Sequence, residues 1–187
     1  MPTSAAAMFL KRRMRARIHS CLAGLLGLWS CMPPAWADSS VEYRLKVAFV
    51  YNFISFTRWP AGVGSPLNLC VYGPDPFGES LDKLQGRGVA DYTLAVRRIS
   101  SVDALAGCQV VFISRSAIGN LPHVLDSLKG RPVLTMADTP GAVHQGVAIN
   151  MTTEQDTIHF EANAAAARNS GLVLSSKLLR LATEVYQ

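Results

Sequence analysis

The side chains that could do chemistry are few after residue 37, and they do not form a recognisable set. Three histidines remain there, His123, His144 and His159, and no two of them have the spacing of metal ligands. Ser116 and Ser176 have no nucleophile-elbow motif around them. Catalysis needs several groups that converge on one point. The sequence therefore predicts a protein that is not an enzyme, with no metal site and no cofactor.

One loop occupies a position at which phosphate-binding loops occur. Residues 73–78 read Gly-Pro-Asp-Pro-Phe-Gly and lie between a predicted strand and a predicted helix. The loop has neither the G-x-G-x-x-G nor the G-K-[ST] pattern, and its two prolines remove backbone N–H donors. We interpret it as a turn, and a ligand site there stays an open alternative.

The N-terminus has the three parts of a secretory signal peptide. Five basic residues lie within positions 11–17. An apolar run follows over positions 21–29, far shorter than the ~20 residues that a bilayer-spanning helix needs. The segment Pro33–Ala37 then places alanines at the third and the first position before a cut at Asp38. This order of segments is typical of an exported protein.

The predicted organisation is therefore a signal peptide over residues 1–37, cleaved after Ala37, and one exported α/β domain over residues 38–187. An uncleaved membrane anchor is one alternative. A lipoprotein signal that ends at Cys31 is another, although the bulky Trp29 disfavours it. In a bacterium, export places the domain in the periplasm.

Removal of the signal changes the charge of the chain. The full sequence has a formal charge of +5, whereas residues 38–187 contain 13 basic and 13 acidic residues. A neutral domain has no overall attraction to nucleic acid or to an anionic membrane, so we expect no nucleic-acid partner. The remaining 150 residues are enough for one domain with its own core.

Two cysteines remain after the predicted cut, Cys70 and Cys108. In an exported protein an even pair predicts a disulfide, and two buried free thiols are the alternative. The two residues are 38 positions apart. On the chain-entropy account, closing such a loop stabilises the fold by ~4 kcal/mol.

The order of predicted elements indicates an α/β fold. A strongly apolar helix is expected over residues 41–57, with Ser39 and Glu42 as its capping box. Strands and short helices then alternate, which predicts a parallel sheet with helices on its faces. A hairpin and two helical segments follow. The expected strands are 67–72, 92–96, 109–113, 132–135, 146–151 and 157–162, and the expected later helices are 78–84, 101–105, 121–128, 164–169 and 176–186. The prediction is a three-layer fold around a mostly parallel sheet of five to six strands, with an antiparallel C-terminal hairpin.

The first helix has more apolar residues than one buried face requires. A helix that is apolar nearly all round is usually covered on more than one side. We therefore expect a homodimer that uses outward positions such as Val50 and Ile54. A helix that is merely central in the domain is the alternative interpretation.

The two ends of the domain resemble the YfiR-like periplasmic regulators. That family favours K-A-x-x-x-Y-N-F-x-x-F-x-x-W-P near its start and F-E-x-N followed by G-L-x-x-S-S-x-L-L-x-L-A near its end. In this sequence the alanine of the first motif is shifted by one position. The matching positions are Lys46, Tyr51, Asn52, Phe53, Phe56, Trp59 and Pro60, then the segments 158–163 and 170–182.

The resemblance implies regulation rather than catalysis. Members dimerise and repress the periplasmic domain of an inner-membrane diguanylate cyclase, which lowers cyclic di-GMP and with it exopolysaccharide and biofilm production. An outer-membrane, peptidoglycan-binding lipoprotein sequesters them and relieves the repression. Oxidation of family cysteines affects repression. Cys70 and Cys108 match one family pair, whereas Val143 and Asn150 stand where a second pair is expected. Redox control that needs four cysteines is therefore in doubt. A small periplasmic ligand-binding module is the alternative function.

The C-terminal motif also suggests a partner-binding site. Glu161 with Leu172, Leu174 and Leu178 could form a patch in which leucines supply contact area and one carboxylate orients the partner. The resemblance favours this interpretation, because C-terminal apolar positions and the F-E motif have been implicated in repression. The alternative is that the leucines belong to the core and Glu161 is a solvated strand residue.

Overall fold

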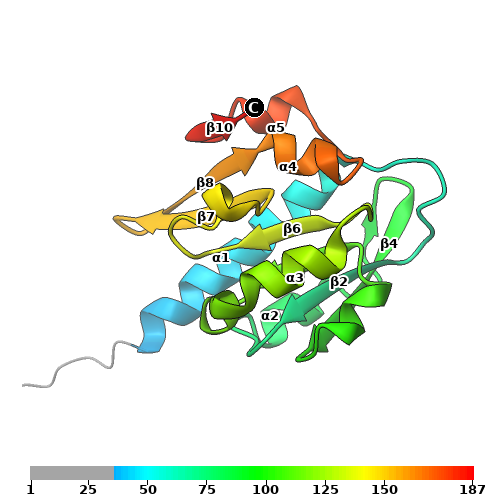
Figure 1. The fold of residues 1–187 in the computed structure, drawn as a ribbon. Coiled ribbons are helices and arrows are strands. Elements are labelled where there is room, and N and C mark those ends of the chain that lie inside the picture. Colours follow the sequence, from blue (N-terminus) through cyan, green and yellow to red (C-terminus); the bar gives the residue numbers. More distant parts are fainter. Residues whose placement is uncertain (1–35) are drawn as a thin grey trace, which may run out of the picture. The chain divides into compact units, whose positions relative to one another are not determined.

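Strands far apart in the sequence are brought together in the computed structural model, which describes residues 36–187 (Figure 1). The strands are β1 (Thr57–Arg58), β2 (Leu67–Tyr72), β3 (Gly88–Val89), β4 (Tyr92–Ile99), β5 (Val110–Ile113), β6 (Leu134–Ala137), β7 (Ile149–Glu154), β8 (Thr157–Asn163), β9 (Val173–Leu174) and β10 (Glu184–Tyr186). The helices are α1 (Trp36–Ser55), α2 (Glu79–Asp82), α3 (Leu121–Leu128), α4 (Ala164–Asn169) and α5 (Ser176–Leu179), with 3₁₀ turns η1 (Asp103–Gly107), η2 (Arg115–Asn120) and η3 (Val143–Gln145).

Eight of these strands form one sheet in the order β10-β8-β7-β6-β5-β2-β4-β3. The pairs from β4 to β7 are parallel, and so is the pair β10–β8. The predicted C-terminal hairpin, β7–β8, is antiparallel, as is β3–β4. The α/β class and the mostly parallel sheet are confirmed. The expected count of five to six strands is too low, because β3 and β10 have only two and three residues and leave no periodicity to recognise.

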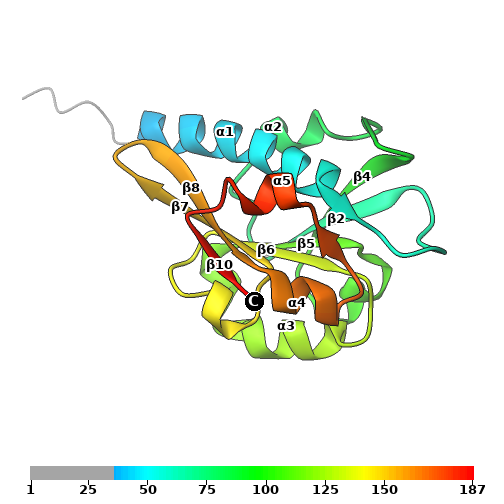
Figure 2. The same ribbon diagram turned by 90° about the horizontal axis from the view of Figure 1, so that it is seen from above.

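The sheet has helices on both faces, which gives three layers. Figure 2 shows α1 and α2 on one side of the strands and α3 on the other. Two apolar clusters fill the spaces between the layers, one under α1 and α2 and one under α3. The central strands β5 and β6 are buried at every position, and all their residues except Thr135 are apolar, as is usual for buried parallel strands.

The first helix begins at Trp36, ahead of the predicted capping box, and it is more deeply embedded than expected. Val50 and Ile54 are 0% and 1% exposed, so the expectation that they point outward is wrong. The sheet covers one side of α1, and α2 and the strand β3 pack on its flank. The exposed large apolar residues of this helix are Val41 and Leu45, at 43% and 50%.

The predicted C-terminal helix over residues 176–186 is also wrong. The helix α5 ends at Leu179, and the chain then turns into β10 beside β8. The backbone N–H of Thr183 donates to the carbonyl of Phe160 and joins this turn to the hairpin. The last residues therefore extend the sheet instead of covering it.

The predicted signal peptide falls almost wholly on residues 1–35, outside the described residues. The expected cut after Ala37 falls in the first turn of α1. Among residues 36–187, no helix combines the length and the hydropathy that crossing a bilayer requires.

Candidate functional site

The site begins with Glu161 on β8, which is partly buried near one edge of the sheet. Its register partner on β7 is Asn150, and its register partner on β10 is Glu184. Registered residues on neighbouring strands lie side by side on one face of a sheet. A row of three polar side chains therefore crosses the strands β7, β8 and β10, and two of them are carboxylates.

The three leucines proposed to surround Glu161 are not on the surface. Leu172, Leu174 and Leu178 are 0%, 6% and 2% exposed. They pack in the same apolar cluster as α1, because β9 pairs with β1 directly after that helix. The expectation of an exposed leucine patch is therefore wrong, and the leucines form part of the core.

Other residues supply exposed apolar surface in this segment. Leu181 is 66% exposed and lies between α5 and β10, and Val173 on β9 is 49% exposed. We call Glu161, Leu181 and Glu184 the C-terminal edge. It combines an apolar side chain with two carboxylates, one on β8 and one on the short strand β10 that forms the end of the sheet. An edge strand has unpaired backbone groups that a partner chain can use.

Asn150 connects this edge to the interior. Its side chain is completely buried, and its Nδ2 donates to Glu161 Oε2 at 3.0 Å. Its Oδ1 accepts from the backbone N–H of Thr139 at 3.1 Å. One amide therefore holds both the carboxylate on β8 and the loop that follows β6.

That loop contains a buried charge cluster. Asp138 is 1% exposed, and its Oδ2 lies 2.7 Å from Lys46 Nζ on α1 and accepts from the Tyr43 hydroxyl at 2.7 Å. Lys46 also contacts Glu42 Oε1 at 2.6 Å. Arg115 donates to the Asp138 carbonyl at 2.8 Å. The cluster fastens α1 across the carboxyl ends of the strands, and Lys46 is the first matching position of the motif that opens the domain.

The pKa values of the cluster agree with its role as a fixed anchor. Burial alone would raise the pKa of the Glu42 carboxyl, but hydrogen bonds from Lys46 and Thr153 outweigh it and hold the pKa below its ordinary value. Burial and the hydrogen bond to Asp138 raise the pKa of Tyr43 far above its ordinary value. At neutral pH Tyr43 therefore stays a donor and Glu42 stays ionised.

A crevice of about 430 Å³ lies next to this cluster. The chain runs from β2 to β4 on one side and then returns to β5 on the other side of β2, so the strand order reverses between β2 and β5. In open α/β sheets, ligands bind at the carboxyl ends of strands at such a point. Tyr43, Asp75 and Arg115 are among the residues that line the crevice. Within the described residues, Asp138 Oδ1 and Thr139 Oγ1 are buried without a hydrogen-bond partner.

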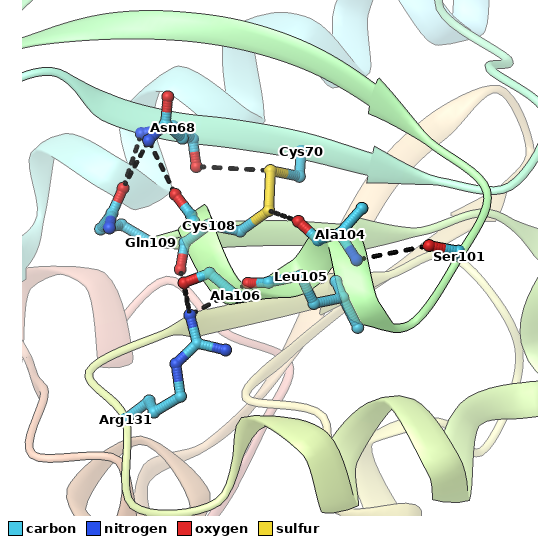
Figure 3. The surroundings of a disulfide bond; sticks show 10 residues. Asn68, Cys70, Ser101, Ala104, Leu105, Ala106, Cys108, Gln109 and Arg131 are labelled. Atoms are coloured by element: carbon cyan, nitrogen blue, oxygen red, sulfur yellow. Dashed lines mark hydrogen bonds between the residues drawn. A yellow bond between two sulfur atoms is a disulfide. The ribbon is translucent and has the colours of Figure 1, made fainter.

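The predicted disulfide is present between Cys70 and Cys108 (Figure 3). Cys70 lies on β2 and Cys108 immediately precedes β5, so the bond joins neighbouring parallel strands with a Cα–Cα distance of 6.0 Å. Both residues are at most 1% exposed. Asn68 donates to the Gly107 carbonyl, and Arg131 donates to the Cys108 carbonyl, so the surrounding backbone is also fixed. The bond braces the sheet and is shielded from reductants.

Sequence reasoning missed three residues of this site. Asp138 shows no pattern with its neighbours in the sequence, because its partner Lys46 is 92 positions away. Asn150 was noted only as the residue in place of a cysteine. Glu184 was assigned to a helix. The polar residues of an otherwise apolar strand, such as Asn150 in Ile149–Met151, are the signal that could have found one of them.

The residues described do not bring a metal site together. Among residues 36–187 there is no group of three or more His, Cys, Asp or Glu side chains that could hold a metal ion. His144 instead packs edge-on against Tyr186, with ring centroids 4.8 Å apart.

Comparison with known families gives one match along almost the whole domain. The profile of a family described as YfiR/HmsC-like matches residues 43–183. The matched region includes α1, the disulfide, the charge cluster and Glu161, and it ends just before Glu184.

Two solved bacterial structures illustrate the similarity of fold. An ABC domain from Streptococcus pneumoniae, crystallised in complex with L-Trp, has a TM-score of 0.50 and 11% identity over 77% of this chain and 60% of that one. A conserved domain protein from Vibrio cholerae has a TM-score of 0.50 and 13% identity over 76% of this chain and 60% of that one. This chain thus spans about three fifths of each structure's length. At these identities the likeness concerns the fold alone.

Proposed function

This chain belongs to the YfiR/HmsC-like family, and on that premise we propose that it binds and represses the periplasmic domain of an inner-membrane diguanylate cyclase. The family consists of periplasmic regulators of diguanylate cyclase signalling and not of catalysts. Repression would lower cyclic di-GMP in the cytoplasm and with it exopolysaccharide and biofilm production. The family match over residues 43–183 is the observation that carries this proposal.

We place the cyclase-binding surface at the C-terminal edge. Glu161 and Glu184 offer two neighbouring carboxylates, and the exposed Leu181 offers apolar contact area. Burial of an apolar centre supplies affinity, while charged groups fix orientation and partner choice. The buried leucines Leu172, Leu174 and Leu178 would act by holding this edge in place and not by direct contact.

Two regulatory inputs belong to the same proposal. An outer-membrane lipoprotein would sequester the protein and so release the cyclase. Redox state would act through Cys70 and Cys108, and because this bond is buried, oxidation would matter when the protein folds after export and not as a fast switch of the folded protein.

We further propose a homodimer that uses the exposed side of α1. Val41 and Leu45 are one helical turn apart and replace Val50 and Ile54 as the outward apolar positions. Leu45→Glu should weaken the dimer because it places a carboxylate in an apolar contact. Light scattering across a concentration series is the measurement, and a wild-type protein that is monomeric throughout would end this part of the proposal.

The interaction is tested by capture and by one charge reversal. Tagged mature protein should retain a membrane diguanylate cyclase from solubilised membranes, and Glu161→Lys should reduce that recovery without unfolding the domain. Asp91→Lys is a matched control, since it reverses one exposed carboxylate between β3 and β4, at the opposite end of the sheet. Circular dichroism must be unchanged for both variants. Equal cyclase recovery by wild type and Glu161→Lys would show that Glu161 is not part of the cyclase-binding surface. Failure of the wild type to retain any cyclase would contradict the proposed function.

A small-ligand-binding module is a second candidate function, and the crevice next to Asp138 supports it. The crevice lies at the topological switch point, and the buried Asp138 Oδ1 has no partner among the described residues. A ligand in the crevice would contact Tyr43 and Arg115, which both donate hydrogen bonds to Asp138. Native mass spectrometry of protein purified from periplasm should then find a retained metabolite that Ser116→Trp excludes, and an empty protein would contradict this candidate.

A further inference from the structure

A second pocket, of about 340 Å³, lies between α1 and α2, and no residue of the C-terminal edge lines it. Five residues of α1 line it, and three of them are polar or charged: Arg44, Tyr51 and Asn52. They are spaced by seven and eight positions, which places them on one side of the helix. Ser80 on α2, Lys83 after it and Arg87 before β3 line the opposite wall.

The pocket has a strong local excess of positive charge. Arg44, Lys83 and Arg87 are exposed cations, and no carboxylate is among the lining residues. Within residues 36–187 none of the three takes part in a salt bridge, whereas other basic side chains, such as Lys46, Arg98 and Lys129, do. Residues 38–187 carry equal numbers of acidic and basic groups. Three unneutralised cations around one cavity are therefore a local feature and not a consequence of composition.

The two walls of the pocket are joined by Tyr51 and Arg87, and this contact preorganises the Arg87 side chain. The guanidinium carbon of Arg87 lies 4.3 Å from the centre of the Tyr51 ring, and the Tyr51 hydroxyl donates to the Gly88 carbonyl at 2.9 Å. The stacking leaves the edges of the guanidinium free to donate hydrogen bonds. A cation that is already held in place loses less conformational entropy when it binds a ligand.

We propose that this pocket binds a phosphate-class anion. Arg44, Lys83 and Arg87 would supply charge, and Asn52 and Ser80 would add neutral hydrogen-bond donors. Several cations favour a ligand with more than one negative charge, and the forked donors of arginine match two oxygens of a phosphate group. A cavity of this volume accommodates a compact anion, since ligand pockets begin at about 300 Å³.

The phosphate could belong to a free small molecule or to a lipid headgroup, and two arms of one experiment distinguish these sources. In the first arm, inorganic pyrophosphate is titrated into the mature protein and amide NMR shifts are followed. In the second arm, the protein is sedimented with phosphatidylcholine vesicles that contain or lack phosphatidic acid, with and without pyrophosphate as competitor.

Pyrophosphate should shift the amide signals of the α1 and α2 residues that line the pocket, and it should bind about tenfold more weakly for each cation removed. The test variant is Lys83→Gln with Arg87→Gln. The matched control is Lys129→Gln with Arg180→Gln, which removes two exposed charges elsewhere and should bind as the wild type does. Thermal unfolding without ligand verifies that both variants are folded.

Sedimentation with phosphatidic acid vesicles that pyrophosphate reverses would assign the anion to a lipid headgroup. Pyrophosphate binding without sedimentation would assign it to a free molecule. The proposal is overturned if pyrophosphate causes no shift at millimolar concentration, if the pocket variant and the control lose binding equally, or if an acidic peptide binds the pocket while pyrophosphate does not.

Discussion

The structure on each face of the sheet is fastened by a different kind of bond. On the α3 side, a buried disulfide joins β2 to the start of β5 and closes that half of the core covalently. On the α1 side, a buried ion pair between Lys46 and Asp138 fastens the helix to the loop after β6. A covalent bond in the core does not respond to pH or to salt, whereas an ion pair and its hydrogen bonds depend on the charge of each member.

The C-terminal edge is connected to the ionic face and not to the covalent one. Asn150 links Glu161 to Thr139, and Asp138 is the residue directly before Thr139 in the chain. A partner at the edge would therefore act on the loop that anchors α1. The difference between the two faces indicates that the disulfide side is the rigid frame and the α1 side is the part whose stability can be adjusted.

The largest effect should come from breaking the ion pair. Lys46→Ala removes the nearer of two cations from the buried Asp138 carboxylate and leaves only Arg115, at 3.9 Å, and loss of a buried ion-pair partner costs about 3–5 kcal/mol of the free energy of unfolding. Urea denaturation followed by circular dichroism measures it. The double variant Lys46→Met with Asp138→Leu removes both charges and should recover most of the loss. A cost below about 1 kcal/mol for Lys46→Ala would show that the ion pair does not anchor α1.

Loss of the disulfide should have the second-largest effect on stability. Replacing Cys70 and Cys108 together by alanine should lower the free energy of unfolding by about 2–4 kcal/mol, because the unfolded chain regains freedom. In the unmodified protein, thiol labelling after unfolding without reductant should find no free thiol in residues 38–187. Two reactive thiols would contradict the bond, and an unchanged melting temperature in the alanine variant would contradict its role as a frame.

A smaller effect is expected at the link between the edge and the loop. Asn150→Leu removes two hydrogen bonds and leaves the Thr139 N–H without its acceptor, at a cost of about 1–3 kcal/mol. Hydrogen exchange at Thr139 should become faster than in the wild type. Asn163→Ala serves as the control. It removes a side-chain amide on β8 that donates to the Val143 carbonyl, and it should leave hydrogen exchange at Thr139 unchanged. Unchanged hydrogen exchange at Thr139 in Asn150→Leu would show that Asn150 does not connect the C-terminal edge to this loop.

The smallest effect should be on the acid side of the pH profile. The folded protein holds the pKa of Glu42 below its ordinary value, so this group adds stability above the unfolded pKa of about 4.3 and loses it as the pH falls further. Glu42→Gln should flatten the loss of stability between about pH 5 and pH 3. Thermal melts across this range measure the difference. Identical profiles for the two proteins would show that Glu42 contributes nothing to the anchor.

Local patterns predicted most of the fold. The strand Leu67–Tyr72 and the helices Leu121–Leu128 and Ala164–Asn169 have the expected bounds, because each is an apolar or alternating segment with clear turn residues at its ends. The disulfide was predictable from the cysteine count, since only two cysteines follow the signal segment.

The site was less predictable, because its contacts join distant residues. Nothing near Asp138 in the sequence points to Lys46, and only the fold brings α1 over the end of β6. The apolar excess of α1 suggested exposure of Val50 and Ile54, but the same excess is satisfied by burial on several sides within one protomer. Glu184 was missed because a three-residue edge strand follows helix-like spacing in Leu178, Leu181 and Val185.

The most direct test of regulation is the cyclic di-GMP level in cells. Three strains that carry the cognate cyclase are compared: one that lacks this chain, one that makes it with residues 1–37, and one that makes residues 38–187 without them and so retains the protein in the cytoplasm. The account predicts a low level only in the strain with the exported form, and high, equal levels in the other two. A level that does not change when the exported protein is present, or that falls equally with the retained form, would contradict a periplasmic repressor.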